Sequence, residues 1–442
     1  MKPNDTFIDS ACIRLGSEAA SDQRIAPEDV PSAWEAAEDS IFLASALGHV
    51  EAVQNILRDA PSLAKQKGGP RDWDPLTYLC YSHFLRSPLA ESDFIATAEM
   101  LLQAGADPNT GFFQEQHSPE PIFESVLFAA AGIAHHEALT RLLLKHGADP
   151  NDGETPYHVP EGYENGAFEA VFQSGKLNES SIATLLLRKI DFHDGRAIKW
   201  LLEQGVDPNL QGMWGKTALQ SAIVRGNHRS IVELLLQHGA EPGLPGNDGN
   251  AHTVAATYGR GDVIQSFAEG GFTPHLEAKE QILSTCAIGD RHRTKELASQ
   301  YPDSVQAIKA RGGFFLSEFA GNGNTEGIQL LLGLGCEINS SHQLGDPYFD
   351  ITLDSTPLHV AAWRARHETV SFLLENGADI HKVDSKRRTP LHLAVEASVN
   401  SYWTELRSEQ SVASLIEAGA TPEGVRFPCG YEKIDTLLAP LV

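Results

Sequence analysis

The sequence predicts an all-α fold, a solenoid of about ten to eleven helix-turn-helix units with β-turn fingers and helical caps. One observation is a leucine-rich phrase ending near a glycine, found as LLQAGADPN (101–109), LLKHGADPN (143–151), LLEQGVDPN (201–209), LLQHGAEP (235–242) and LLENGADI (373–380). A second is the phrase Thr-Pro-x-His, which occurs at 155–158, 356–359 and 389–392. Recurring helix signals of this kind are typical of a stack in which each unit buries its apolar face against its neighbours.

The two phrases predict where helices end and begin. In the first, the leucines pack inward and the glycine adopts the left-handed backbone that ends a helix. In the second, the threonine hydroxyl caps free amides, and proline occupies the first turn, where its missing N–H has no partner to lose. Together the caps, helix ends and apolar spacing resemble the ankyrin repeat, and residues 354–380, DSTPLHVAAWRARHETVSFLLENGADI, are nearly a consensus copy.

The resemblance divides the chain into three parts. We expect an N-terminal capping helix or arm over 1–32, the repeats over 33–425, and a C-terminal capping helix over 426–442. The middle repeats follow the ankyrin period of about 33 residues, and the longer ones carry inserts. The second helices are expected to end at Ala60, Gly105, Gly147, Gly175, Gly205, Gly239, Gly270, Tyr301, Gly335, Gly377 and Gly419.

One repeat, over 155–175, departs from the pattern. Phe168, Val171 and Phe172 have the spacing of an apolar helix face, which predicts a normal second helix. Its first helix is interrupted by Pro160, which removes a hydrogen bond. We therefore expect a notch in the stack, lined by Tyr157, His158, Tyr163 and Glu164. Sequence drift in a permissive repeat and a functional pocket are alternative explanations.

Charge and composition exclude several function classes. Lys+Arg number 34 against 59 Asp+Glu, and the net charge of −25 argues against broad contacts with nucleic acid or with a membrane surface. The apolar run 126–134 is too short to span a bilayer, and no secretory signal is apparent. Five separated cysteines favour a reducing, cytoplasmic location. No metal-ligand or nucleotide-binding motif is present, so we predict no metal site and no cofactor.

Aromatic and basic residues mark the predicted binding face. The ankyrin resemblance implies that first helices line a concave face, with the fingers beside it. The segment GGPRDWDPLTYLCYSHFLRS (68–87) resembles bacterial multi-ankyrin proteins for which no activity is established. Tryptophan and tyrosine offer rigid contact area, and arginine binds carboxylates and phosphates. The candidates for binding are Trp73, Tyr78, Tyr81, His83, Trp214, Arg225, Tyr258, Arg260, Trp363, Arg364 and Arg366, with Arg387 and Arg388 at the next finger. A merely solvated face is the alternative.

Two enlarged fingers complete the candidate sites. The insert 111–125 carries Glu115, His117 and Glu120, and the insert 343–355 carries Asp346, Tyr348, Asp350 and Asp354. We predict a scaffold that binds a partner protein, and a small anionic ligand at the arginines is the second class of partner. The alternative is an enzyme or small-ligand-binding protein with a pocket near 155–166, using His158, Tyr163, His117 and Glu115.

Overall fold

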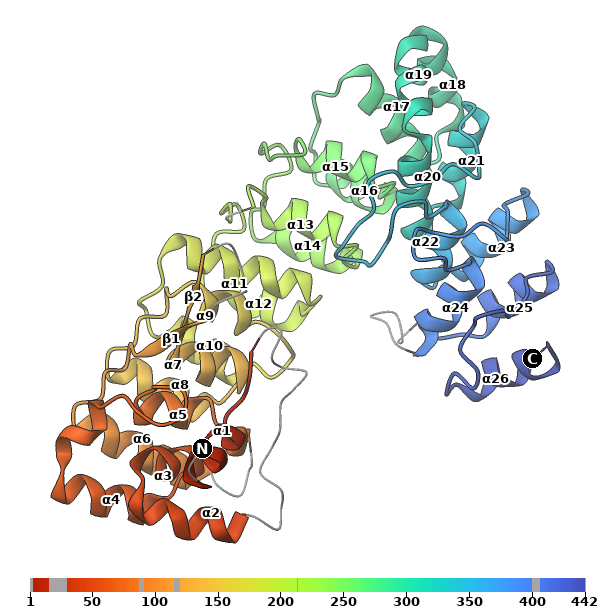
Figure 1. Ribbon diagram of the computed structural model, residues 1–442. Coiled ribbons are helices and arrows are strands. Elements are labelled where there is room, and N and C mark those ends of the chain that lie inside the picture. The colour runs from red at the N-terminus through yellow and green to blue at the C-terminus, as the bar shows by residue number, and fades with distance from the viewer. Residues whose placement is uncertain are drawn as a thin grey trace. The chain divides into compact units, whose positions relative to one another are not determined.

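The computed structural model describes residues 3–15, 30–86, 91–114, 120–212, 214–399 and 406–441. The chain forms two compact bodies (Figure 1). The first body comprises residues 1–206 and 210–214, and the second comprises 207–209 and 215–442. In each body antiparallel helix pairs stack on their neighbours, which confirms the predicted all-α solenoid.

The first body contains the only strands of the described residues. They are β1 (Gly111–Gln114) and β2 (Ile122–Ser125), which pair antiparallel, so the first enlarged finger is a β-hairpin. The helices are α1 (Pro3–Ala11), α2 (Val30–Ala36), η3 (Ala37–Asp39), α3 (Ile41–Leu47), α4 (Val50–Asp59), η4 (Pro61–Lys65), α5 (Pro75–Cys80), η5 (His83–Arg86), α6 (Glu91–Gln103), α7 (Val126–Phe128), the π-helix η6 (Ala129–Ile133), α8 (Glu137–Lys145), α9 (Glu154–His158), α10 (Gly166–Gln173), α11 (Glu179–Asp191) and α12 (Gly195–Glu203).

The second body is built from helices alone in its described residues. In chain order they are α13 (Ala218–Val224), α14 (Arg229–Gln237), α15 (Ala251–Thr257), α16 (Gly261–Glu269), α17 (Ala278–Ala287), α18 (Arg291–Gln300), α19 (Pro302–Ala310), α20 (Gly312–Gly321), α21 (Thr325–Gly333), α22 (Pro357–Trp363), α23 (His367–Glu375), α24 (Pro390–Val399), α25 (Gln410–Glu417), α26 (Glu432–Leu438) and η8 (Ala439–Leu441).

The helices pair in sequence order. The pairs are α3–α4, α5–α6, α7/η6–α8 and α11–α12 in the first body, and α13–α14, α15–α16, α17–α18, α20–α21, α22–α23 and α24–α25 in the second. Between α8 and α11 the pattern changes, because α9 packs mainly on α11 and η6, and α10 packs mainly on α8. Glycine takes the left-handed backbone after most second helices, for example Gly105 and Gly377. After α16 this residue is Gly271, with φ of +79°, and not the expected Gly270, whose φ is −78°.

Helix α19 is not anticipated by the sequence pattern. Tyr301 ends α18 and also begins α19, with Pro302 in the first turn, so a helix stands where a finger would normally follow. The residue fits both roles because its non-helical backbone interrupts one helix and the proline that follows it favours the start of another.

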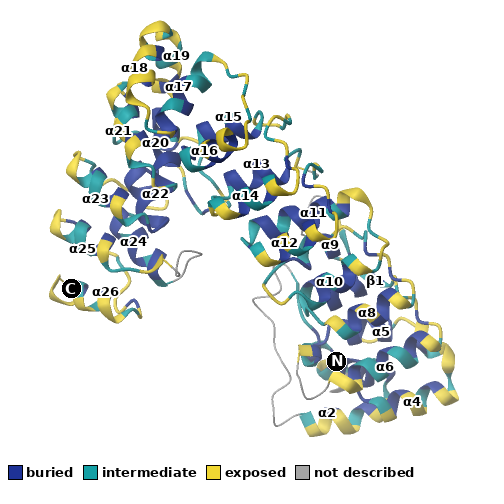
Figure 2. Ribbon diagram, turned by 180° about the vertical axis from the view of Figure 1, so that it is seen from behind, coloured by how far each residue is buried: buried dark blue, intermediate teal, exposed yellow. Residues whose placement is uncertain are grey.

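Local sequence signals explain the helix starts. Thr356 and His359 form a reciprocal capping box, and the His359 Nε2 lies 3.0 Å from the carbonyl oxygen of Arg388 in the next finger. The histidine therefore joins adjacent repeats while satisfying free amides at the helix start. Figure 2 shows that α13, α15 and α22 are largely buried, whereas α18 and α26 carry much exposed surface.

Candidate functional site

The first helix of the 155–175 repeat is short, and we call the non-helical connection that follows it, residues 159–165, the notch. Helix α9 ends at His158, and α10 does not begin until Gly166. Pro160 lies in the non-helical connection, where it costs no helical hydrogen bond. The Thr155 amide donates to Asp152 from within α9, so the Thr-Pro-x-His phrase does not start this helix as it starts α22. His158 is thereby released from the capping role that His359 performs.

Two basic residues of α11 hold the connection between α9 and α10. Arg188 donates to the Tyr157 carbonyl oxygen at 3.1 Å and forms an ion pair with Glu161 at 2.8 Å. Lys189 is fully buried, and its Nζ donates to the Gly162 carbonyl oxygen at 3.0 Å and to Asn165 Oδ1 at 2.6 Å. Side chains from the next repeat thus replace the backbone bonds that the shortened helix lacks.

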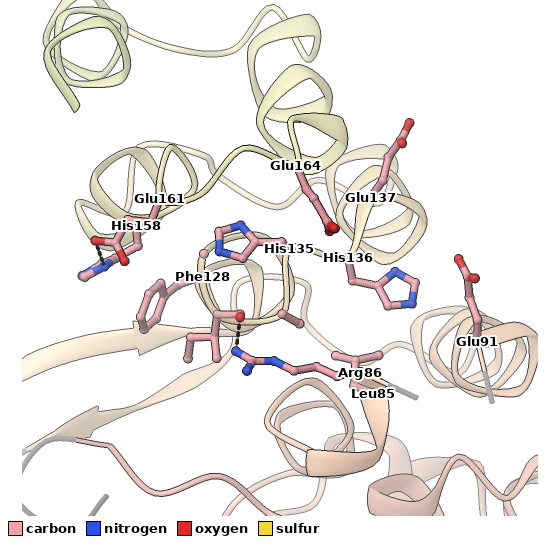
Figure 3. Close-up of a pocket in the computed structure, with 13 residues that line it drawn as sticks. Leu85, Arg86, Glu91, Phe128, His135, His136, Glu137, His158, Glu161 and Glu164 are labelled. Atoms are coloured by element: carbon pink, nitrogen blue, oxygen red, sulfur yellow. Dashed lines mark hydrogen bonds and ion pairs between the residues drawn. The ribbon is translucent and has the colours of Figure 1, made fainter. Parts of the chain in front are cut away.

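An open pocket of about 870 Å³ lies beside the notch in the first body (Figure 3). We call it the histidine–glutamate pocket. It is lined by Leu85, Arg86, Glu91, Phe128, Gly132, Ile133, Ala134, His135, His136, Glu137, His158, Glu161 and Glu164. The lining therefore combines residues of η5, α6, η6, α8 and the α9–α10 connection. Of the residues predicted at the notch, His158 and Glu164 reach it.

His158 is placed between two carboxylates. Its Nε2 lies 3.2 Å from Glu154 Oε2, and its Nδ1 lies 3.0 Å from Glu161 Oε1. Burial acts to lower the pKa of His158, but the hydrogen bonds and charges of Glu154 and Glu161 outweigh it and raise the pKa to about 9. His158 is accordingly a cation at neutral pH, and it neutralises part of the negative charge around it.

The π-helix η6 forms one wall of the pocket. Gly132 is needed there, because a Cβ at this position would lie 2.9 Å from the Cβ of His158 and 2.8 Å from the Phe128 ring. After η6, His135 adopts a left-handed backbone with φ of +50°. At the corresponding turn glycine takes this conformation in some repeats, as at Gly48 and Gly289, and a residue with a side chain takes it in others, as at His193 and Ala365. A side chain is therefore kept at a position where glycine would fit with less strain.

The imidazole of His135 does not make all the hydrogen bonds that it could make. Within the described part of the chain, its buried Nδ1 has no hydrogen-bond partner. Burial lowers the pKa of His135, and Arg86 lowers it further, so the ring is neutral at physiological pH. A buried ring nitrogen without a partner, in a strained backbone position beside a π-helix, is typical of functional sites.

The pocket carries an excess of negative charge. Four glutamates line it, against Arg86 and the protonated His158. Glu161 is already paired with Arg188, and Glu137 with Arg141. Glu91 and Glu164 form no ion pair with any described residue. The arrangement favours a ligand that presents a cation together with some apolar surface, since Leu85, Phe128 and Ile133 complete the walls.

The other residues predicted for chemistry are not brought together. Tyr163 is 62% exposed and donates to the Phe192 carbonyl oxygen at 3.0 Å, away from the pocket lining. Glu115 and His117 lie outside the described residues. The buried Glu124, which the sequence does not single out, lies near Glu154, and burial raises its pKa to about 7.

The aromatic residues of 68–87 do not form an open surface. Trp73, Tyr78 and Tyr81 are 7%, 0% and 0% exposed, so their expected place on the binding face is wrong. The Trp73 ring stacks on the ring of Phe112 in the β-hairpin, with 4.4 Å between the ring centres. The Tyr81 hydroxyl donates to the Ser125 carbonyl oxygen. The enlarged finger covers these rings, which are core residues. His83 is partly exposed.

The arginine and aromatic candidates of the second body do converge, but mostly inside it. Arg260, Trp363 and Arg364 are 5%, 8% and 1% exposed, so they too are wrong as open contact residues. The insert 343–355 packs on part of this cluster. Arg225, Tyr258 and Arg366 are half-buried. Trp214, in the first body, is 39% exposed and lies against Tyr157.

The titratable pocket residues that the sequence does not single out are Arg86, Glu91, His135, His136, Glu137 and Glu161. The available signal was His135 itself, which occupies a turn position where several other repeats, though not all, have glycine. Among the described residues no cluster of three or more potential ligands is arranged to hold a metal ion. None of the described helices has the length and apolarity needed to cross a membrane. All five cysteines are free and buried.

Comparison with known proteins agrees with this architecture. The sequence model of the family described as ankyrin repeats (3 copies) matches residues 182–277 and 316–422. The human transient receptor potential cation channel subfamily A member 1 is 26% identical over 46% of the chain and 22% of its own length. Human Rabankyrin-5 is 39% identical over 15% of the chain and 6% of its own length. The chain thus spans less than a quarter of either relative.

A solved structure, the human ASB11 ankyrin repeat domain, is 20% identical, with a TM-score of 0.25, over 54% of this chain and 98% of that one. The structural unit is identified instead by the repeated helix pairs, their caps and the match to the family model. Residues 182–277 and 316–422 are therefore ankyrin repeats.

Proposed function

We propose that this chain is a scaffold that binds a partner protein, and that the histidine–glutamate pocket receives a basic side chain of that partner. Ankyrin repeats generally serve in protein–protein binding, and repeat stacks offer extended surfaces for it. The observation that carries the proposal is the pocket of about 870 Å³ with two carboxylates, Glu91 and Glu164, that form no ion pair with the described residues. A reducing, cytoplasmic location fits the five free cysteines.

A lysine or arginine side chain suits both parts of this lining. Its methylene groups pack on Leu85 and Phe128, and its charged end meets the carboxylates. Arginine is the better fit, because its planar group bonds two acceptors at once and stacks on rings. Arg86 forms no ion pair with Glu91 or Glu164, since its guanidinium donates to the Ile133 carbonyl oxygen, and its single charge is less than that of the two carboxylates together.

Charge reversal in the pocket tests partner binding. We expect Glu164→Lys to reduce the capture of specific partners about tenfold or more, since it replaces attraction with repulsion at the pocket. Partners captured by the wild-type chain and by each variant are quantified by mass spectrometry. Glu203→Lys is the matched control, because Glu203 is exposed on α12 of the same body. Equal capture by wild type and Glu164→Lys would exclude the pocket as the binding site.

A defined probe tests the preferred cation. N-acetyl-arginine amide should bind the pocket weakly, whereas N-acetyl-citrulline amide, its neutral isostere, should bind at least about fivefold more weakly. Saturation-transfer NMR on the whole chain measures both. If the arginine and citrulline amides bound equally well, the pocket would not prefer a cation. Whether it binds a partner protein would still be decided by the Glu164→Lys experiment.

Substitution of His135 tests whether its ring contributes to partner binding or only to the stability of the fold. His135→Gly relieves the left-handed backbone, so we expect the free energy of unfolding to change by no more than about 1 kcal/mol. The same change removes the ring that lines the pocket, so partner capture should fall. Urea denaturation and quantitative capture give the two readings. A variant that keeps full capture would show that the ring serves only the fold.

Small-ligand binding at the same pocket is the second candidate function. Its cavity falls within the range of about 300–1,000 Å³ that is common for small-molecule sites. A basic metabolite would then bind the pocket with no protein partner, and the charge-reversal variant would lose the metabolite and leave protein capture unchanged.

A further inference from the structure

The second enlarged finger folds into a closed loop. The Asp346 amide donates to the Ile351 carbonyl oxygen at 2.7 Å, and the Ile351 amide donates back to Asp346 at 2.9 Å. Asp350 has a left-handed backbone with φ of +53°, which tightens the loop between these bonds. The residues at the tip are Tyr348, Phe349 and Asp350, two aromatic rings followed by a carboxylate. We call residues 346–351 the tip loop.

Basic side chains from separate repeats contact the tip loop. The guanidinium of Arg225, at the end of α13, lies 3.6 Å from the centre of the Tyr348 ring. The guanidinium of Arg364, after α22, lies 4.3 Å from the centre of the Phe349 ring. The Trp363 indole donates to the Phe349 carbonyl oxygen. Both rings are therefore bound through their faces by cations.

The carboxylate of the tip loop has its own pair of partners. Lys386 Nζ lies 2.6 Å from Asp350 Oδ1, and Arg388 Nη1 lies 2.7 Å from Asp350 Oδ2. Arg388 also donates to the Asp350 carbonyl oxygen at 3.2 Å. Although burial acts in the other direction, these cations lower the pKa of Asp350. Four basic residues thus converge on three consecutive residues in a chain whose net charge is −25.

These contacts differ from those that build the stack. Repeats in a solenoid normally contact only their sequence neighbours. The tip loop precedes α22, yet it reaches Arg225 at the end of α13, past the repeats that contain α15, α17 and α20 (Figure 1). Its bonds are ring-on-guanidinium and carboxylate-on-cation contacts, the kinds used to recognise a bound peptide.

We propose that Arg225, Trp363, Arg364, Lys386 and Arg388 form a recognition site for an acidic–aromatic turn of a partner protein, and that the tip loop occupies this site in cis. The site rests on the proposed partner-binding function, but it is independent of the histidine–glutamate pocket. A partner would supply two rings followed by an aspartate or glutamate. The tip loop would act as an intramolecular competitor, because a tethered ligand has an effective concentration in the millimolar range.

The test compares the chain with and without its own ligand. In the variant, residues 343–354 are replaced by a short Gly-Ser linker, which the neighbouring chain ends allow because the His342 amide already donates to the Ser355 carbonyl oxygen at 2.7 Å. The probe is a fluorescein-labelled peptide of residues 343–354, QLGDPYFDITLD. By fluorescence anisotropy, we expect it to bind the variant roughly 100-fold more tightly than the wild-type chain.

A neighbouring pair of arginines gives the matched control. In the linker variant, Arg388→Ala should weaken peptide binding about tenfold, since Arg388 makes two contacts with Asp350. Arg387→Ala should leave it unchanged, because Arg387 is exposed and, among the described residues, Asp350 pairs with Lys386 and Arg388 and not with Arg387. A linker variant with native circular dichroism that binds the peptide no better than wild type would overturn the proposal.

A second variant keeps the loop and covers the case in which the linker variant misfolds. Tyr348→Ala combined with Asp350→Asn weakens the tip loop without removing it, so the labelled wild-type peptide should then bind the full chain at least about tenfold better. Unchanged binding would likewise overturn the proposal. Neither variant alters the histidine–glutamate pocket. If the tip-loop proposal fails, the proposed partner binding at the pocket is therefore unaffected, and if the pocket proposal fails, the tip-loop proposal is unaffected.

Discussion

Lys189→Met should destabilise the first body by about 3–5 kcal/mol. Lys189 is completely buried, and its Nζ contacts Asp194 Oδ2 at 3.2 Å as well as Asn165 and the Gly162 carbonyl oxygen. Methionine fills a similar volume but leaves Asp194, which is 5% exposed, as a buried charge without its cation. It also leaves two acceptors in the α9–α10 connection unsatisfied.

Urea denaturation followed by circular dichroism measures this loss. Lys199→Met is the matched control, because Lys199 forms an exposed pair with Glu203 at 3.7 Å, and such pairs contribute about 0–1 kcal/mol. Hydrogen exchange should further show that residues 159–165 lose protection in Lys189→Met. If the two lysine variants were equally stable, Lys189 would not be what holds the connection in place.

Acid should destabilise the second body through two buried histidines. Burial lowers the pKa of His252 to about 4, and it lowers the pKa of His359 to about 4 although the Arg388 carbonyl acts to raise it. Both values lie below about 6.5, the ordinary value in an unfolded chain. The unfolded state therefore binds more protons, so each contribution to stability is complete above about pH 6.5 and is lost as the pH falls towards 4.

The expected loss is roughly 3 kcal/mol for each histidine over this window, since one pKa unit corresponds to about 1.4 kcal/mol. Urea denaturation at pH 7.5 and pH 4.5 measures it. His252→Gln should remove about half of the pH dependence, whereas His238→Gln, at an exposed position, should leave it intact. A pH dependence that is the same in wild type and His252→Gln would contradict the assignment. His158 acts in the opposite direction, because its contribution is complete below about pH 6.5 and is lost as the pH rises through about 9.

Much of the fold follows from local signals that a sequence displays. Helix starts at Thr356 and helix ends at residues such as Gly377 depend on a few neighbouring residues, so they can be read without knowing the tertiary structure. The shortened α9 is of the same kind, because Pro160 restricts its own backbone. Helix α19 is not predicted, because the repeat pattern places the end of a unit at Tyr301. A β-turn finger is then expected to follow Tyr301, and the structure has a helix there instead.

The two candidate sites, by contrast, depend on contacts between segments that are far apart in the sequence, which the repeat period does not predict. Periodicity placed Trp363 and Arg364 on the face of the first helices, but it could not show that the tip loop folds back onto them. The histidine–glutamate pocket likewise joins η5, η6 and the α9–α10 connection. Its shape requires the π-helix, Gly132 and the buried Lys189, none of which has a local sequence signature.

Photo-crosslinking from inside the pocket tests the central claim most directly. A diazirine amino acid in place of Ile133, which lines the pocket, is compared with one in place of the exposed Glu203. The account predicts that crosslinks from position 133 identify a partner segment containing arginine or lysine, and that Glu164→Lys abolishes them. Crosslinks that are equally frequent from both positions, or that persist in Glu164→Lys, would contradict the claim that the pocket binds a basic side chain of a partner.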